Sequence, residues 1–254
     1  IPYVARLMAY LEWDAWRGVA SKLLQAVINS SSSLKSADEV AQLFRMIEPL
    51  LRDGDGGSAL ADDEDEDVSP QQAQSDVFKA EQMLVARVVH LMHHESTDEQ
   101  FRMYGLAKKA FGKGGKQRMQ HTFTPLVFAA LGLARKVYAT EVKRAAAQRQ
   151  VAQADATVEG EAEAVAPAAA AVDLPPKPQF GSKKVLGMVL EVLTAMATSF
   201  GELSLNLFLN AALAADEFNY SAISYEFLKE ALLTYESDVT NSKAQARVLN
   251  KIVG

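Results

Sequence analysis

Residues 203–215 read LSLNLFLNAALAA, and this stretch decides between a fold that contains β-strands and one that is helical throughout. Over 203–209 every second residue is leucine, which is the period of a half-buried strand. The pattern then continues into an alanine-rich run, and alanine is the strongest helix former. No other segment of the chain reads as a strand that could pair with it. The stretch is therefore predicted to be a helix, apolar around its circumference and buried between neighbours on both sides.

Apolar residues at three- and four-residue intervals predict helices on either side of this stretch. The last four predicted helices follow one another with loops of only a few residues between them. The expected segments are 12–29, 36–51, about 78–92, 101–111, a long helix that begins at 124–125, 184–200, 202–216, 221–237 and 242–253.

Local signals set several of these helix ends. Ser36-Ala37-Asp38-Glu39 and Ser96-Thr97-Asp98-Glu99 are both predicted to form capping boxes, in which serine and glutamate satisfy each other's backbone amides. Thr124-Pro125 is predicted to start the long helix, since proline is favoured at the first helical position. Pro49 is expected to bend the last turn of its helix because it has no amide donor.

Eight or nine helices without strands define an all-α fold. Successive antiparallel pairs could close into a bundle or stack into an open α-solenoid, and spacing alone leaves both open, with the helix count favouring the solenoid. A strict tetratricopeptide or ankyrin period is not visible, whereas degenerate pairs of roughly 40 residues are allowed.

Two segments have too few large apolar residues to offset the entropy of ordering them, and we expect them to be disordered insertions in one continuous segment, 1–254. One spans about 53–72 and contains six consecutive acids at 62–67; the other spans about 151–180 and is rich in alanine and proline. The acidic run equals the whole net charge of −6, so the rest of the chain is neutral. A neutral body argues against nucleic-acid binding, which needs a basic stripe.

The amino-acid composition excludes several classes of catalytic and metal site. The 254 residues include no cysteine, which excludes disulfides, thiolate nucleophiles and cysteine-ligated metals. The chain starts at Ile1 without a methionine, so we expect it to be a fragment. No uncharged run of 18 apolar residues and no signal-peptide pattern is present, so we expect it to be neither secreted nor membrane-spanning.

The strongest candidate for catalysis is a histidine cluster. His90, His93 and His94 lie at helical spacing near a helix end, and a metal-dependent helical hydrolase that uses them is the alternative function. No His-Glu-x-x-His order supports it, and the cluster also suits the negative end of a helix dipole. The glycine-rich run at 112–117 lacks the strand and hydroxyl residue of a phosphate-binding loop, and is interpreted as a helix C-cap. We therefore predict no catalytic residues, metal or cofactor.

Several blocks nevertheless carry a specific resemblance. Residues 114–118 (GGKQR) and 123–130 (FTPLVFAA), then 207–215 (LFLNAALAA), 224–227 (SYEF) and 242–245 (SKAQ), follow the order and spacing of one family. Weaker similarity extends through 10–13 and 101–111. The chain resembles the C-terminal half of the vacuolar protein sorting 35 family, the large scaffold subunit of retromer. Only the two insertions lie outside the resemblance.

The resemblance implies an α-solenoid of antiparallel HEAT-like helix pairs and a non-enzymatic role. Retromer is a peripheral coat on the cytoplasmic face of endosomes that sorts cargo to the Golgi and the plasma membrane. The resemblance implies binding to the metallophosphoesterase-like small subunit, vacuolar protein sorting 29, through contact residues that the sequence does not identify. The arrestin-like subunit is expected to bind only through an N-terminal part missing here, and membrane contact is expected to be indirect.

The resemblance also implies self-association. The acidic corner with Glu95 and Asp98 and the basic pair Lys183 and Lys184 correspond to the region where two copies of the scaffold meet. Opposite charges on two exposed corners suit a symmetric contact that is made twice. We therefore expect these four residues to lie in a homodimer contact.

Overall fold

The computed structural model of the chain describes residues 7–8, 10–30, 32–52, 70–158 and 177–238. Within these residues the regular elements are helices, and Leu34 and Met92 form an isolated bridge between two loops. The helices are α2 (Trp13–Asn29), α3 (Ala37–Met46), α4 (Glu48–Leu51), α5 (Pro70–Leu91), α6 (Thr97–Gly112), α7 (Lys116–Val158), α8 (Ser182–Ala197), α9 (Gly201–Glu217) and α10 (Ser221–Asp238). The prediction of an all-α fold is confirmed for this part of the chain.

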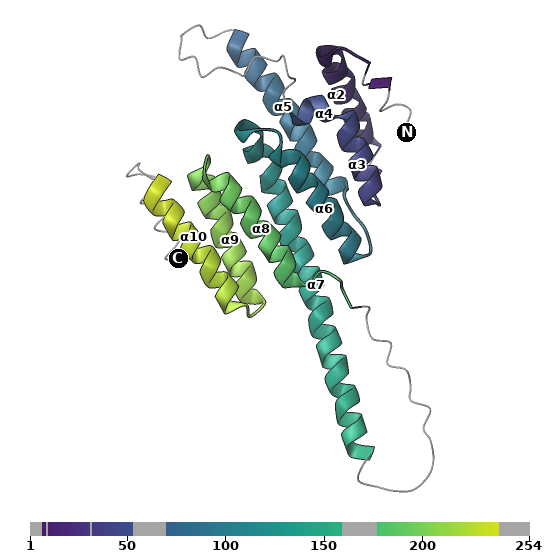
Figure 1. Cartoon of the computed structure of the whole chain (residues 1–254), viewed down its shortest axis with the longest axis vertical. Helices are drawn as coiled ribbons and strands as arrows, with labels where there is room; N and C mark the ends of the chain where they lie inside the picture. Colours follow the sequence, from purple (N-terminus) through teal and green to yellow (C-terminus); the bar gives the residue numbers. More distant parts are fainter. Residues whose placement is uncertain (1–6, 9, 31, 53–69, 159–176, 239–254) are drawn as a thin grey trace.

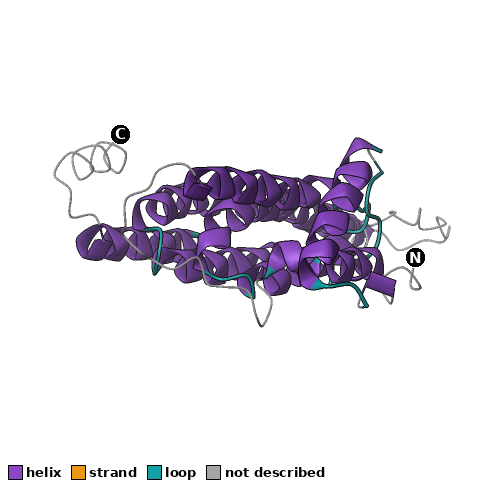
Figure 2. Cartoon of the chain, turned by 90° about the horizontal axis from the view of Figure 1, so that it is seen from above, coloured by secondary structure: helices purple, strands orange, loops and turns teal. Residues whose placement is uncertain are grey.

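The longer helices lie in two rows. In one row α2, α5, α7 and α9 contact each other in that order, and in the other α3, α6, α8 and α10 do the same. Contacts between α6 and α7, α7 and α8, and α9 and α10 join the rows. Figure 1 shows the helices side by side in chain order, and Figure 2 shows the two layers. α2 and α10 therefore lie at opposite ends of the described stack.

The stretch that opened the sequence analysis is helical, as predicted. It lies within α9, whose buried residues occupy several sides of the helix because α7, α8 and α10 all pack against it. They are Ser204, Leu205, Leu207, Phe208, Ala211, Ala212, Ala214 and Ala215.

The first predicted capping box is formed only in its serine half at the start of α3, because the glutamate accepts the amide of Lys35 and not that of Ser36. The Glu39 amide donates to Ser36 Oγ at 3.2 Å, and the Glu39 carboxylate accepts the Lys35 amide at 2.8 Å. The far end of this helix is interrupted at Ile47, and α4 begins with Pro49 in its first turn. The bend expected from Pro49 is therefore a break, since proline cannot donate to the preceding turn.

The predicted helix start at Thr124-Pro125 is wrong. α7 begins at Lys116, directly after Gly115, which has a positive φ of 80°, and it continues past Pro125. Proline removes one intrahelical hydrogen bond, but Phe123, Leu126 and Val127 are buried beside it. Burial on both sides of the proline outweighs the lost bond.

The insertions differ from their predicted limits where the structure describes them. α5 already begins at Pro70, and α7 continues to Val158, past the expected boundary at 151. Residues 53–69 and 159–176, and the helix predicted at 242–253, lie outside the described residues. In the described part of the chain, no helix combines the length and the apolar character that a bilayer crossing requires.

Replacing Ser36 with alanine tests the cap of α3. The change removes the acceptor for the Glu39 amide and should lower the free energy of unfolding by about 1 kcal/mol. Urea unfolding measures this value. An unchanged midpoint and slope would show that the capping box does not contribute to stability.

Candidate interaction site

The acidic and basic residues predicted to mediate self-association lie near one another on a single corner. The Asp98 carboxylate, in the first turn of α6, accepts the backbone amides of Gln179 and Phe180, each at 3.0 Å. The ring of Phe180 packs on Phe101 with centroids 4.7 Å apart. Lys183 follows Phe180 by three residues. The bonds from Asp98 to residues 179 and 180 therefore bring the acidic and the basic residues of the predicted site together within one copy.

A second carboxylate holds the same segment from the other side. Glu141 of α7 accepts the Ser182 amide at 3.1 Å and the Ser182 hydroxyl at 2.6 Å. A Cβ on Gly181 would lie 2.9 Å from this carboxylate, so glycine leaves the space that the contact needs. The start of α8 is therefore held by side chains of both α6 and α7.

Tyr220 extends this polar cluster to the turn before α10. Its hydroxyl lies 2.8 Å from Ser182 Oγ, whose own hydrogen is donated to Glu141, so Tyr220 acts as the donor. Burial raises the pKa of Tyr220, with part of the shift offset by the Ser182 hydrogen bond, so the hydroxyl remains a donor. None of these three residues was a predicted site residue.

The two lysines of the predicted basic pair differ in their surroundings. Lys183 places its ammonium 5.0 Å from the centroid of the Tyr220 ring, a cation–π contact within the chain. Lys184 is exposed. The pKa of Glu191, two turns further along the same side of α8, is lowered mainly by its hydrogen bond to Lys108 and also by the charge of Lys184. Both lysines are exposed, and they differ in that Lys183 contacts the Tyr220 ring whereas the charge of Lys184 acts on Glu191.

The second predicted capping box, at Ser96, is absent. No side chain caps α6, and the Glu99 carboxylate instead accepts the Ala37 amide at the start of α3, at 2.8 Å. The Ser96 amide donates to Nδ1 of His94 at 2.9 Å. Packing of α3 against α6 has redirected the glutamate that the local pattern assigned to Ser96.

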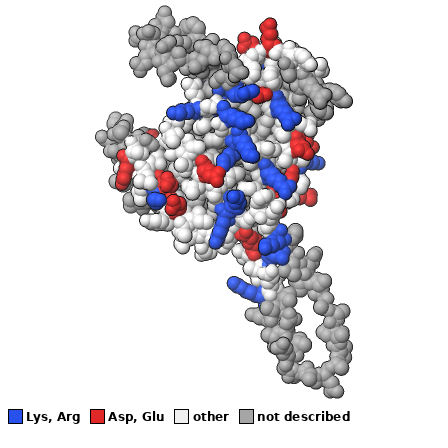
Figure 3. Space-filling view, viewed as in Figure 1, with Lys and Arg blue, Asp and Glu red and all other residues white. Residues whose placement is uncertain are grey.

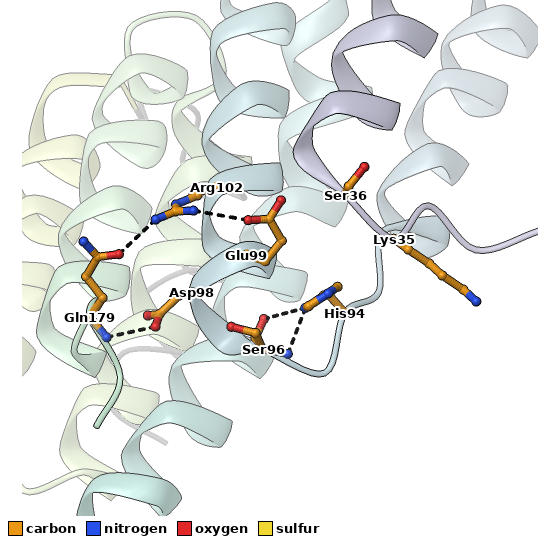
Figure 4. Close-up of a pocket in the computed structure, with 8 residues that line it drawn as sticks. All are labelled: Lys35, Ser36, His94, Ser96, Asp98, Glu99, Arg102 and Gln179. Atoms are coloured by element: carbon orange, nitrogen blue, oxygen red, sulfur yellow. Dashed lines mark hydrogen bonds and ion pairs between the residues drawn. The ribbon is translucent and has the colours of Figure 1, made fainter. Parts of the chain in front are cut away.

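These contacts surround an open pocket of about 520 Å³ between the starts of α3 and α6. Figure 4 shows side chains from both helices and from residue 179 around it. Its lining residues are Lys35, Ser36, His94, Ser96, Asp98, Glu99, Arg102 and Gln179. Arg102 bridges two sides of the pocket, since it bonds to Gln179 at 3.0 Å and to Glu99 at 3.4 Å.

Among the described residues, the histidines are not gathered with other metal-binding side chains as the alternative function requires. His90 and His93 are exposed, and His94 uses Nδ1 to accept the Ser96 amide. In the regions that the structure describes, no three His, Asp or Glu side chains are placed to hold a metal ion. The fourth histidine, His121, lies on α7, where burial and the charge of Lys79 lower its pKa.

The glycine-rich run forms a turn between helices. A helix, α6, precedes it, and Gly115 adopts the positive φ that glycine accepts without steric cost. A Cβ on Gly114 would collide with the carbonyl oxygen of Leu51. The glycines therefore permit a tight turn and close packing against α4.

Charged side chains link neighbouring helices across the surface. Figure 3 shows Lys and Arg side chains down the middle of one face, with Asp and Glu among them. Lys108 of α6 pairs with Glu191 of α8, and Arg135 of α7 pairs with Glu217 of α9 at 2.8 Å. Such exposed pairs contribute little energy individually, but both lie between adjacent helices of the stack.

The described residues define the class of protein: it is an all-α stack of helices. At one corner of this stack, polar side chains link neighbouring helices and the loop that leads into α8. The chain belongs to the family of Vacuolar protein sorting-associated protein 35, whose sequence profile matches residues 1–254.

Relatives of the chain include three proteins with this name. It is 28% identical over 249 residues to Vacuolar protein sorting-associated protein 35B of Arabidopsis thaliana, covering 98% of this chain and 26% of the relative. Identity is 27% over 248 residues with protein 35A of the same plant, covering 98% and 27%. Vacuolar protein sorting-associated protein 35 of Dictyostelium discoideum is 26% identical over 248 residues, covering 97% and 27%. The chain thus spans about a quarter of the length of these relatives.

Replacing Asp98 with alanine tests the contact that forms the corner. The substitution removes a charged acceptor of two backbone amides and should lower the free energy of unfolding by about 1–2 kcal/mol, less than for a fully buried pair. Hydrogen exchange at Gln179 and Phe180 should accelerate. Glu95→Ala is the matched control, since Glu95 is exposed on the same corner. Unchanged exchange at both amides in the Asp98 variant would contradict the assigned role.

Proposed function

We propose that the chain is part of the non-enzymatic scaffold subunit of the retromer coat and that it forms an α-solenoid of HEAT-like helix pairs. The observation that carries this proposal is the pair of helix rows, α2–α5–α7–α9 and α3–α6–α8–α10, in which each helix contacts the next member of its row. Stacked helix pairs present long continuous surfaces, which suit binding to other proteins. Membership of the family supports the same role.

The proposal places the chain in the cytoplasm, peripheral on endosomal membranes, in the sorting of cargo to the Golgi and the plasma membrane. Residues 1–254 form one solenoid segment, in which the spacers are limited to the parts of the predicted insertions that lie outside α5, α7 and the held residues 179 and 180. Membrane contact is indirect, and the arrestin-like subunit binds another part of the whole scaffold.

The metallophosphoesterase-like small subunit is the proposed partner of this chain, and α10 offers it an apolar surface. Tyr225, Leu228 and Leu232 are exposed and lie on one face of α10, at spacings of three and four residues. Leu213 of α9 is 66% exposed and follows Ala212, whose carbonyl accepts the Ser224 hydroxyl beside Tyr225. Adjacent exposed apolar side chains of this size are typical of interaction surfaces.

Charge substitutions on this face test the partner contact. Tyr225→Glu combined with Leu228→Glu should weaken binding of the small subunit by roughly 30-fold or more, because an apolar contact would be replaced by two buried charges. Calorimetric titration measures the affinity. Met83→Glu is the matched control, since Met83 is 60% exposed on α5, far along the stack, and should change the affinity less than twofold. Equal affinity of the double variant and the parent would refute this surface.

The proposed contact between two copies uses the corner described above. Asp98 is bonded to two backbone amides and Lys183 lies against the Tyr220 ring, so we choose the exposed Glu95 and Lys184 of the four predicted residues as the pair that meets between copies. A two-fold contact would place Lys184 of one copy against Glu95 of the other, twice.

Charge reversal tests this contact. Lys184→Glu should weaken self-association by roughly 2- to 10-fold, since exposed pairs contribute little, and added salt should weaken the parent in the same direction. Adding Glu95→Lys to that variant should restore association, while Lys229→Glu on α10 serves as a control. Sedimentation velocity gives the constants. If neither the charge reversal nor the salt concentration changed the self-association constant, this would contradict a contact between copies at this corner.

A further inference from the structure

The two helices that carry the proposed partner surface are acidic. α9 and α10 together contain seven aspartate and glutamate residues but only one basic residue, Lys229. Lys and Arg side chains follow the middle of the face that Figure 3 shows, whereas acidic side chains predominate toward α10. The apolar side chains of the partner surface therefore lie among negative charges.

Two of these carboxylates are neutralised within the chain. Lys229 pairs with Glu226 on the same helix at 3.3 Å, and Arg135 of α7 pairs with Glu217 at 2.8 Å. Each of these pairs uses the basic residue that lies beside the carboxylate. The remaining acids of the surface have to be considered one by one.

Asp216 and Glu236 keep uncompensated charges beside the apolar residues. Within the described part of the chain, neither carboxylate takes part in a hydrogen bond or an ion pair, and both residues are exposed. Asp216 follows Leu213 by three residues, and Glu236 follows Leu232 by four. These spacings place each acid on the same side of its helix as the exposed apolar residue. The apolar surface thus has one free negative charge on each of its two helices.

These two acids do not serve the stability of their helices. Asp216 lies in the last turn of α9 and Glu236 in the last turn of α10, and neither turn contains a basic residue. The C-terminal end of a helix carries the negative end of its dipole, so a carboxylate there is unfavourable by roughly 0.3–1 kcal/mol. An acid in such a place, exposed and beside apolar side chains, suits a contact with another molecule.

We infer that the protein that binds this surface presents Lys and Arg side chains around an apolar centre. Tyr225, Leu228 and Leu232 meet the centre, and the cations of the partner meet Asp216 and Glu236 at the rim. A partner with an acidic rim would be repelled by the same two carboxylates. The inference rests on the proposed contact with the small subunit and adds to it the charge of the partner's surface.

Exposed charges at the rim of a contact act mainly on the rate of association. Each exposed ion pair contributes little to affinity, but charge complementarity steers the two proteins toward the productive encounter. The rate of association and its dependence on salt therefore report the sign of the partner's rim separately from the apolar contact.

Reversal of the two rim charges tests the inference with the whole chain and the purified small subunit. Asp216→Lys combined with Glu236→Lys should lower the association rate constant by roughly 3- to 10-fold near 0.1 M salt, and added salt should remove most of the difference. Biosensor kinetics measure both rate constants. Asp14→Lys combined with Asp76→Lys is the matched control, since it makes the same change of charge at exposed positions of α2 and α5 and should change the rate less than twofold.

Four results would overturn the inference, and they separate it from the proposed function. An unchanged rate in the rim variant, while the apolar double variant loses binding, would exclude the basic rim and leave the proposed apolar contact standing. A faster rate would mean that the partner's rim is acidic. A thermal midpoint several degrees lower would mean that the acids hold basic residues of the chain itself, such as those at 243, 247 and 251. No binding by the parent chain would refute the proposed partner contact, and the basic rim with it.

Discussion

The arrangement of the chain depends on the need to cover α9 on several sides at once. Its buried side chains include Leu207 and Phe208, which are adjacent in sequence and therefore point in different directions around the helix. A helix pair alone can cover only one side of such a helix. Each large apolar side chain contributes about 1.5–3 kcal/mol only when it is removed from water, so α9 requires α7 and α8 on one side and α10 on the other. This requirement favours stacking of consecutive helices in two rows.

The segment that leads into α8 is held by carboxylates bonded to backbone amides, together with the packing of Phe180 on Phe101. Asp98 holds residues 179 and 180, and Glu141 holds Ser182. Charged acceptors form stronger hydrogen bonds than neutral ones, and each carboxylate satisfies two donors. The corner that carries the proposed self-contact is therefore the place where the chain re-enters the stack.

Local sequence signals predicted the fold well where the deciding contacts are local. The alanine-rich continuation after Leu209 identified α9 as a helix, and the Ser36 side chain caps α3 within four residues. The same reasoning failed at Ser96, because Glu99 finds a better-placed amide at Ala37, which lies 62 residues away in sequence. It failed at Thr124-Pro125 because buried side chains on both sides of the proline keep the helix continuous. Nothing local indicates that Glu141 meets Ser182 and Tyr220, since these residues come together only after three helices have packed.

The central claim is that the helices form an open stack and not a closed bundle, and a distance measurement between spin labels tests it most directly. The chain has no cysteine, so labels attach only at cysteines introduced at Val19 on α2 and Leu213 on α9, both exposed. With α5 and α7 between these two helices, three steps of 8–10 Å give a separation of at least about 25 Å. Double electron–electron resonance should show one narrow population at or beyond that distance. A population below about 20 Å, as expected if α2 and α9 were neighbours in a closed bundle with their axes 8–10 Å apart and the label arms added, would contradict the account.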